Sequence, residues 1–501
     1  GYGAINQTSI ALWISLILAE KCGVEHPEIR AAIEKTQALY ANWISKGALP
    51  YGNHGPMEHI LTNNGTSGSV AVAFSLLGNV EGAKFYSRMS AAAYNEMLTG
   101  HTGPFFNILW SGLGANMAGP EVAVAFNEKI HWFRTMTRTW DGRFLYMEPR
   151  GGHFNYNGCS STGASLLNYC VGRRALFITG KDSDQSIWRT GRAAKNAVEA
   201  GGIDYTKQNA KSLLALLGSP LPKVRLRAAE MLAVKDADVG DEVMRLLADG
   251  TPDQQIGACH AIVKLKTQGA ADALFDIVSN PEENLWLRQQ AANAMKAIGE
   301  PARKYIPELL KIIAEDQTND PFQDLDRTLG FVVTELAPDP YALDLDQKVF
   351  YKAVHKLLNH KHMWGRTSGM RLIENMPLED FHIVADEMLY VIKDEDRTYT
   401  GYHGDGQRQI GLEILNRLNI KEVIPLTINT IKEKTGRAGA RIRGRTRLLP
   451  KFDANAKPYI PKIKEVLGGR ADKIIKAINE ADTKRDMISF EKAKKIGVNG
   501  E

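Results

Sequence analysis

Side chains that could do chemistry are concentrated in Gly-rich loops of the first 160 residues. They are His, Tyr, Arg and Asn, the types that suit removal of a proton beside a carboxylate. A Tyr or His base takes the proton, and Arg or Asn donors hold the negative charge that develops. We predict His153 and Tyr156 as catalytic residues. The predicted substrate-binding residues are Asn64, His101, Trp140, Arg150 and Asn157.

Two reaction types compete for these loops. Glycoside hydrolysis usually needs two carboxyl groups roughly 5–9.5 Å apart, and the loop candidates for that pair are Glu58, Asp141 and Glu148. β-Elimination of a uronate needs a base and cationic or neutral donors, which match the predicted residues better. A structural interpretation stands beside both, because Gly-rich loops also use Asn, His and Tyr for turns and hydrogen bonds.

Helical periodicity places these loops between paired helices. Apolar residues recur at helical spacing over four pairs. We expect helices at 7–21 and from His26 onward, at 66–77 and 81–98, at 106–117 and 120–138, and at 161–179 and 184–199. Asn6, Asn64, Asn107 and Asn157 each stand just before the first helix of a pair. Because an Asn side chain accepts from free backbone N–H groups there, we predict that they are N-caps.

The composition of the chain changes near Gly202. The first 202 residues hold 31 of the 119 charged residues and six of the eight tryptophans. Few charges and many aromatics indicate a large buried core, whereas the charge-rich remainder indicates a thinner structure with more solvated surface. We predict a hairpin domain over 1–202, repeats over 208–336, further repeats over 346–480 and a polar tail over 481–501.

The repeats are visible as small residues on helices that begin near Pro. Ala228, Ala258 and Ala291 are 30 and 33 residues apart, and each follows a Pro-containing turn. Small residues allow one helix to cross another closely. Stacked pairs then share a core that no single pair could make. This pattern resembles the short HEAT repeats.

The hairpin half resembles an α/α toroid, in which helical pairs about 50 residues apart place their loops on one rim. The segment Trp140-Asp141-Gly142-Arg143-Phe144 is similar to loop motifs of such toroids. The order of the two halves resembles a secreted bacterial family of unknown function. The resemblance implies an all-α protein, with α/α-toroid-like hairpins followed by a HEAT-like α-solenoid.

Several partner classes are not indicated. A net charge of +5 over 501 residues is small for a nucleic-acid binder, and the apolar run of residues 10–19 is too short to span a membrane. The four cysteines have no zinc spacing. We expect His355, His360 and His362, and the basic residues Arg437, Arg441, Arg443, Arg445 and Arg447, to lie on solvated surface. No nucleotide-binding motif is present, so we predict no cofactor and no metal.

We therefore predict a carbohydrate-binding or carbohydrate-processing protein with a HEAT-repeat interaction arm. Its expected partners are a polysaccharide and a protein bound on the concave face of the repeats. The chain begins at Gly1 rather than Met, which is compatible with a processed, extracellular or periplasmic form. The alternative is a non-catalytic scaffold that only presents surfaces to other proteins.

Overall fold

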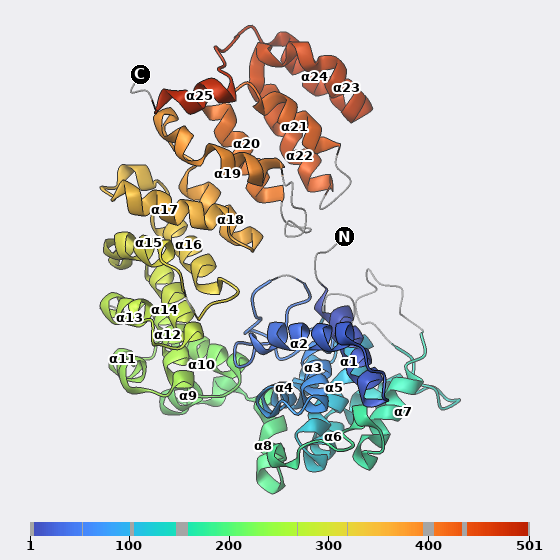
Figure 1. Cartoon of the computed structure of the whole chain (residues 1–501). Helices are drawn as coiled ribbons and strands as arrows, with labels where there is room; N and C mark the ends of the chain where they lie inside the picture. Colours follow the sequence, from blue (N-terminus) through green and yellow to red (C-terminus); the bar gives the residue numbers. More distant parts are fainter. Residues whose placement is uncertain are drawn as a thin grey trace. The chain divides into compact units, whose positions relative to one another are not determined.

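The computed structural model describes residues 5–52, 54–100, 105–146, 159–267, 269–317, 319–393, 405–432 and 438–498. Within these ranges the regular structure is helical, and extended pairing is limited to four isolated bridges. Figure 1 shows the helices in chain order. The predicted all-α fold class is confirmed.

The chain divides into two compact units, Ala4–Leu265 and Lys266–Glu501. The change in composition near Gly202 falls inside the first unit. Leu221 and Val224 explain why, since they belong to the same hydrophobic core as residues of the first helices. The domain boundaries predicted above were drawn from charge content and repeat pattern, not from which residues pack together. They stay predictions for the ranges 1–202, 208–336, 346–480 and 481–501.

The first unit begins with helices that match most of the expected ranges. The odd-numbered helices pack in order, α1 on α3, α3 on α5 and α5 on α7, while α6 packs on α4 and α8. Its helices are α1 (Asn6–Lys21), α2 (Pro27–Ala41), α3 (Thr66–Leu76), α4 (Val80–Ala92), α5 (Phe105–Met117), α6 (Pro120–Thr137), α7 (Thr162–Cys170), α8 (Gly191–Glu199), α9 (Ala210–Leu216), α10 (Pro222–Val234), α11 (Gly240–Asp249) and α12 (Pro252–Leu265).

Helix α3 lies at the centre of the first unit. Ten of its eleven residues are buried, because α1, α4 and α5 all pack against it. Its crossing with α5 depends on two glycines. A Cβ on Gly114 would lie 2.3 Å from the Cα of Gly68, and one on Gly68 would lie 2.2 Å from the carbonyl oxygen of Trp110. A side chain at either glycine would force the two helices apart.

The fourth predicted helical pair, at 161–179 and 184–199, is wrong in length, because both helices are shorter in the structure. Helix α7 ends at Cys170, and 3₁₀ turns occupy Val171–Arg173, Phe177–Thr179 and Gln185–Ile187 before α8 begins. Arg174 and Gly180 have φ angles of 48° and 89°. A residue in the left-handed conformation ends a right-handed helix. The apolar residues of this segment therefore keep a helical spacing in the sequence, although the backbone forms only short separate turns.

The second unit is a run of paired helices. Its helices are α13 (Ala270–Ser279), α14 (Leu285–Ile298), α15 (Ile306–Ala314), α16 (Asp324–Leu336), α17 (Gln347–Leu358), α18 (Met363–Leu372), α19 (Phe381–Lys393), α20 (Asp405–Arg417), α21 (Val423–Ile431), α22 (Ala438–Leu448), α23 (Ile460–Leu467), α24 (Asp472–Glu480) and α25 (Phe490–Ile496). Each odd-numbered helix from α13 to α19 packs on the next helix in the chain.

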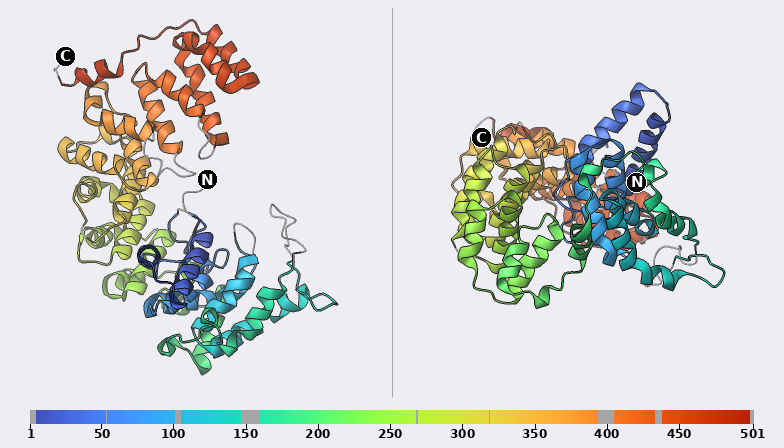
Figure 2. Two further views of the ribbon diagram at one scale, coloured as in Figure 1. Left: turned by 45° about the vertical axis from the view of Figure 1, so that its right-hand side comes forward. Right: turned by 90° about the horizontal axis from the view of Figure 1, so that it is seen from below.

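These pairs stack in two layers. Helices α14, α16, α18 and α20 pack in one row, and α15, α17 and α19 pack in another. Figures 1 and 2 show the pairs following one another along this unit. Each pair buries its apolar stripe against the next pair, so the core runs through the stack. Membership of these repeats in the HEAT family stays a prediction.

A buried arginine in the second helix of several pairs bonds to the end of the first helix or the turn after it. Each guanidinium donates to a backbone carbonyl. The pairs are Arg225 with Ser219 (2.7 Å), Arg288 with Val278 (2.9 Å), Arg366 with His360 (2.7 Å) and Arg408 with Ile392 (2.7 Å). A cation is favourable where helical carbonyls end without partners, so each arginine stabilises the closure of its own helical pair.

The sequence analysis missed these arginines, although a signal is present. Each stands three residues before a small buried residue, which is Ala228, Ala291, Gly369 or Gly411. The small residue marks the helix crossing, and the arginine one turn earlier lies on the same buried face. No described helix combines the length and the apolar character that a bilayer-spanning segment requires.

Candidate functional site

Five of the seven predicted site residues lie outside the described residues: His101, Arg150, His153, Tyr156 and Asn157. The other two differ in environment. The side chain of Asn64 is buried, with 1% of its surface exposed, whereas Trp140 is 97% exposed. Of the predicted residues in the described part of the chain, Trp140 is thus the one that faces solvent.

Trp140 lies in a tight turn whose backbone is fixed by hydrogen bonds. Thr139 N donates to the carbonyl of Arg143 at 2.8 Å, and Gly142 N donates to the carbonyl of Thr139 at 3.0 Å. Asp141 accepts from Thr139 Oγ1 at 2.5 Å and from Arg143 Nε at 2.6 Å. The Thr139 bond, together with those to Arg143, lowers the pKa of Asp141. The carboxylate therefore stays charged and braces the turn.

The turn belongs to a short ribbon of extended backbone that is anchored in the core. Leu145 pairs with Ser160, and Tyr146 N donates to the carbonyl of Cys159 at 2.8 Å. The ring of Tyr146 is completely buried. Buried residues thus fix the base of the ribbon while Trp140 projects from its turn.

The asparagines predicted as N-caps do not cap their helices. The N-cap of α1 is Ile5, and Asn6 Nδ2 instead donates to the carbonyl of Pro50 at 2.7 Å. The N-cap of α3 is Gly65, and Asn64 precedes it with a left-handed φ of 55°. The N-cap prediction is wrong for both. Asn157 lies outside the described residues.

Asn107 is the third residue of α5 and is fully buried, so its N-cap prediction is also wrong. Its Oδ1 accepts from Gly65 N at 2.6 Å, and its Nδ2 donates to the carbonyl of Thr99 at 2.6 Å. A buried amide that both accepts and donates ties two loops to one helix. The recurring asparagines at Asn6 and Asn107 therefore hold neighbouring loops together.

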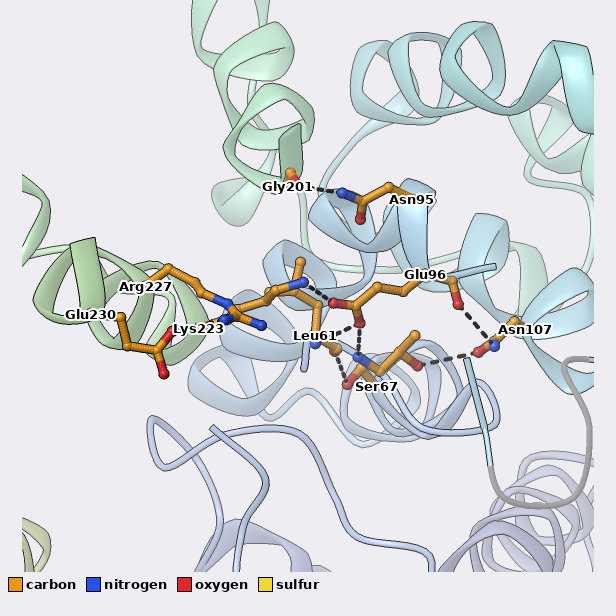
Figure 3. A network of polar contacts seen from close by, with 10 residues as sticks. Leu61, Ser67, Asn95, Glu96, Asn107, Gly201, Lys223, Arg227 and Glu230 are labelled. Atoms are coloured by element: carbon orange, nitrogen blue, oxygen red, sulfur yellow. Dashed lines mark hydrogen bonds and ion pairs between the residues drawn. The ribbon is translucent and has the colours of Figure 1, made fainter. Parts of the chain in front are cut away.

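Glu96 is the centre of a polar network in the first unit, shown in Figure 3. It is 5% exposed, and its Oε2 accepts from Leu61 N at 2.7 Å and from Thr62 N at 3.1 Å. Its Oε1 forms an ion pair with Lys223 of α10. The Glu96 carboxylate therefore connects the loop of Leu61 and Thr62 to α10. Because both of its oxygens already have partners, Glu96 is poorly placed to transfer a proton to or from a substrate. The sequence analysis missed this network, because a single Glu within an expected helix carries no pattern that indicates burial or partners.

The carboxylates weighed for glycoside hydrolysis have a basic side chain beside them where they are described. Glu58 Oε1 lies 3.2 Å from His260 Nε2, and Asp141 pairs with Arg143 at 2.6 Å. Glu148 lies outside the described residues.

Two surface predictions are wrong. His360 is 1% exposed, and its Nε2 bonds the carbonyl of Gln323 at 2.8 Å. Arg441 and Arg445 are 2% and 1% exposed, while Arg443 and Arg447 of the same helix are exposed. A spacing of four residues returns to nearly the same helix face, so Arg441 and Arg445 face the core, where both lie within 4 Å of Asp405. Arg437 lies outside the described residues.

No group of three or more His, Cys, Asp or Glu side chains within the described ranges is arranged to hold a metal ion. Cys22, Cys159, Cys170 and Cys259 are all unpaired.

Residues 1–180 match the model of a protein family described as a domain of unknown function, DUF6288. The match covers the hairpins and the predicted site loops and ends before α8. No curated protein matches the chain.

Proposed function

We propose that the hairpin segment of residues 1–202 binds carbohydrate and that Trp140 is its stacking platform. The observation that carries this proposal is the 97% exposure of Trp140 on a hydrogen-bonded turn. Burying a large apolar side chain stabilises a fold by about 2–3 kcal/mol. The exposed Trp140 side chain does not contribute this stabilisation, which favours a role in binding. A flat apolar ring beside a few polar groups is how sugar sites are commonly built.

The proposal extends to processing of the bound polysaccharide by β-elimination. His153 or Tyr156 would remove the proton beside the uronate carboxylate. His101, Arg150 and Asn157 would hold the substrate, whereas Asn64 is buried and does not reach it. In this proposal the hairpins form an α/α-toroid-like domain, the repeats serve as an arm that captures a protein partner, and the protein acts outside the cytoplasm.

The binding proposal is tested by Trp140→Ala on an immobilised polysaccharide panel that includes neutral and acidic chains. We expect the variant to lose at least tenfold in affinity for the polysaccharide that the parent protein retains. Trp364 is a matched control, since it is also solvent-exposed, at 41%, but lies on α18. Equal retention of Trp140→Ala and Trp364→Ala would contradict the proposal.

Processing is tested separately on the polysaccharide that binds. The elimination reaction leaves a carbon–carbon double bond conjugated to the carboxylate, which absorbs in the ultraviolet at shorter wavelength than the aromatic side chains. We expect the parent protein to produce this absorbance and His153→Ala and Tyr156→Phe to lose it while binding is retained. Absorbance from both variants at the parent rate would remove the assignment of these residues.

A scaffold function remains the second candidate, and exposed apolar residues of α6 favour it. Trp132 and Met136 lie one turn apart on this helix and are 58% and 77% exposed. Such residues together mark protein contact surfaces. If a scaffold is the function, Trp132→Glu with Met136→Glu should abolish capture of a protein partner, whereas Trp140→Ala should leave capture unchanged.

A further inference from the structure

Helices α1 and α7 are the two ends of the row in which α1 packs on α3, α3 on α5 and α5 on α7. The inner members of this row, α3 and α5, have a neighbouring row helix on both sides, and none of their residues is exposed. Each end helix has such a neighbour on one side. One face of α1 and one face of α7 are therefore open to solvent.

The open face of α1 is a stripe without charge. Its exposed residues are Thr8, Ala11, Leu12 and Ser15. Their spacing of three and four places them on one face of the helix, and the side chain of Leu12 is 62% exposed. No charged residue occurs in 6–19. A helix that lacks a polar face is normally covered on all sides, so the α1 stripe is suited to being covered.

The open face of α7 has the same character. Its exposed residues are Gly163, Leu166, Tyr169 and Cys170, and the whole helix contains no charged residue. Leu166 and Tyr169 are 53% and 51% exposed. The guanidinium of Arg134 lies 4.6 Å from the ring centroid of Tyr169. This contact holds the ring in place while half of its surface stays open.

The two stripes are complementary in size and in the charges that flank them. Ala11 and Ser15 are small enough to let the larger Leu166 and Tyr169 approach the α1 backbone. Residues 20–35 hold four Glu and three Lys or Arg, whereas 162–181 hold three Lys or Arg and neither Asp nor Glu. An α1 face beside an α7 face brings opposite charges together, whereas two α7 faces would bring like charges together.

We propose that α1 of one copy of this chain packs beside α7 of a second copy, so that the row of helices continues from one molecule into the next. The contact is head-to-tail, because each copy contributes a different face on either side. Contacts of this type close into a ring or extend as a filament, depending on the rotation between neighbours. This self-association does not depend on the proposed carbohydrate function.

Sedimentation velocity of the full chain over a hundredfold range of concentration tests the proposal. We expect the sedimentation coefficient of the parent to rise with concentration. Leu12→Glu and Leu166→Glu each place a charge in one open face and should weaken association at least tenfold. Val124→Glu is the matched control, since Val124 is 58% exposed on α6, which lies outside the row. The control should associate as the parent does.

A mixture of the two end variants gives the decisive measurement. Leu12→Glu keeps an intact α7 face, and Leu166→Glu keeps an intact α1 face. Their equimolar mixture should therefore form a dimer and nothing larger, although each variant alone stays monomeric. Far-ultraviolet circular dichroism identical to that of the parent shows that both variants are folded.

A parent that stays monomeric over the whole range would overturn the inference. So would an end variant that associates as tightly as the parent, or a Val124→Glu protein that dissociates as the end variants do. A mixture that remains monomeric would show that the α1 and α7 faces do not pair with each other.

Discussion

Asp326 and His360 of the second unit are buried titratable residues whose uncharged forms are favoured. Burial raises the pKa of Asp326 to about 6, although Lys356 lies 3.0 Å away. Burial also lowers the pKa of His360 to about 4, and the nearby guanidiniums of Arg327 and Arg366 add to that effect. The two groups therefore change stability with pH in opposite directions.

For Asp326 the folded pKa lies above the unfolded value of 3.8. Between these values the folded chain binds more protons, so its contribution to stability is largest below about pH 4 and is lost as pH rises through about 6. We expect Asp326→Asn to be more stable than the parent by about 1–2 kcal/mol at pH 7.5. The advantage should be smaller at pH 4.5.

Urea unfolding at the two pH values measures this difference between variant and parent. Asp241→Asn is the control, because Asp241 is exposed on α11. A variant that is less stable than the parent by the same amount at both pH values would show that the Lys356 ion pair outweighs the burial.

At the scale of the element, the buried arginines explain how a charge-rich sequence closes its helical pairs. Arg288 is 4% exposed and bonds the carbonyl of Val278 and the side chain of Gln317. Its methylene groups lie within the core while its head group satisfies the end of α13. The same position in the four pairs that carry Arg225, Arg288, Arg366 and Arg408 thus combines packing with capping.

We expect Arg288→Met to lower the free energy of unfolding by about 2–4 kcal/mol, because it keeps most of the apolar stem but leaves a buried carbonyl without its donor. Denaturant unfolding followed by far-ultraviolet circular dichroism measures the loss. Arg303→Met is the control, since Arg303 pairs with Glu300 on the surface, where such pairs contribute about 0–1 kcal/mol. Equal losses in the two variants would contradict a capping role for Arg288.

At the scale of the whole molecule, the first compact unit continues past the change in composition. Lys223 of α10 pairs with Glu96, Arg225 Nη2 donates to the carbonyl of Ser45 at 3.4 Å, and His260 of α12 lies beside Glu58. Helices α9–α12 therefore belong to the same compact unit as the hairpin segment.

A fragment ending at Leu265 should unfold in one cooperative transition, whereas a fragment ending at Gly202 should not. The shorter fragment loses Lys223, which neutralises buried Glu96, and the core residues Leu221 and Val224. Thermal unfolding monitored by near-ultraviolet circular dichroism tests this expectation. A sharp transition in the shorter fragment at the same temperature as the longer one would show that the hairpins fold without α9–α12.

The sequence by itself determined several helices of the first unit, because apolar periodicity and helix ends depend on residues that are neighbours in the chain. The expected helices at 7–21, 66–77, 106–117 and 120–138 differ from α1, α3, α5 and α6 by one residue at most at either end. It also singled out Trp140, because the segment Trp140-Asp141-Gly142-Arg143-Phe144 resembles loop motifs of α/α toroids.

Only the tertiary structure decided which polar residues are buried. The roles of Asn107, Glu96 and Arg445 arise from partners tens of residues away, such as Gly65, Lys223 and Gln409. A local pattern assigns an Asn to a cap and an Arg to the surface because it contains no such partner. Burial of a polar group is favourable only once folding has brought that partner to it.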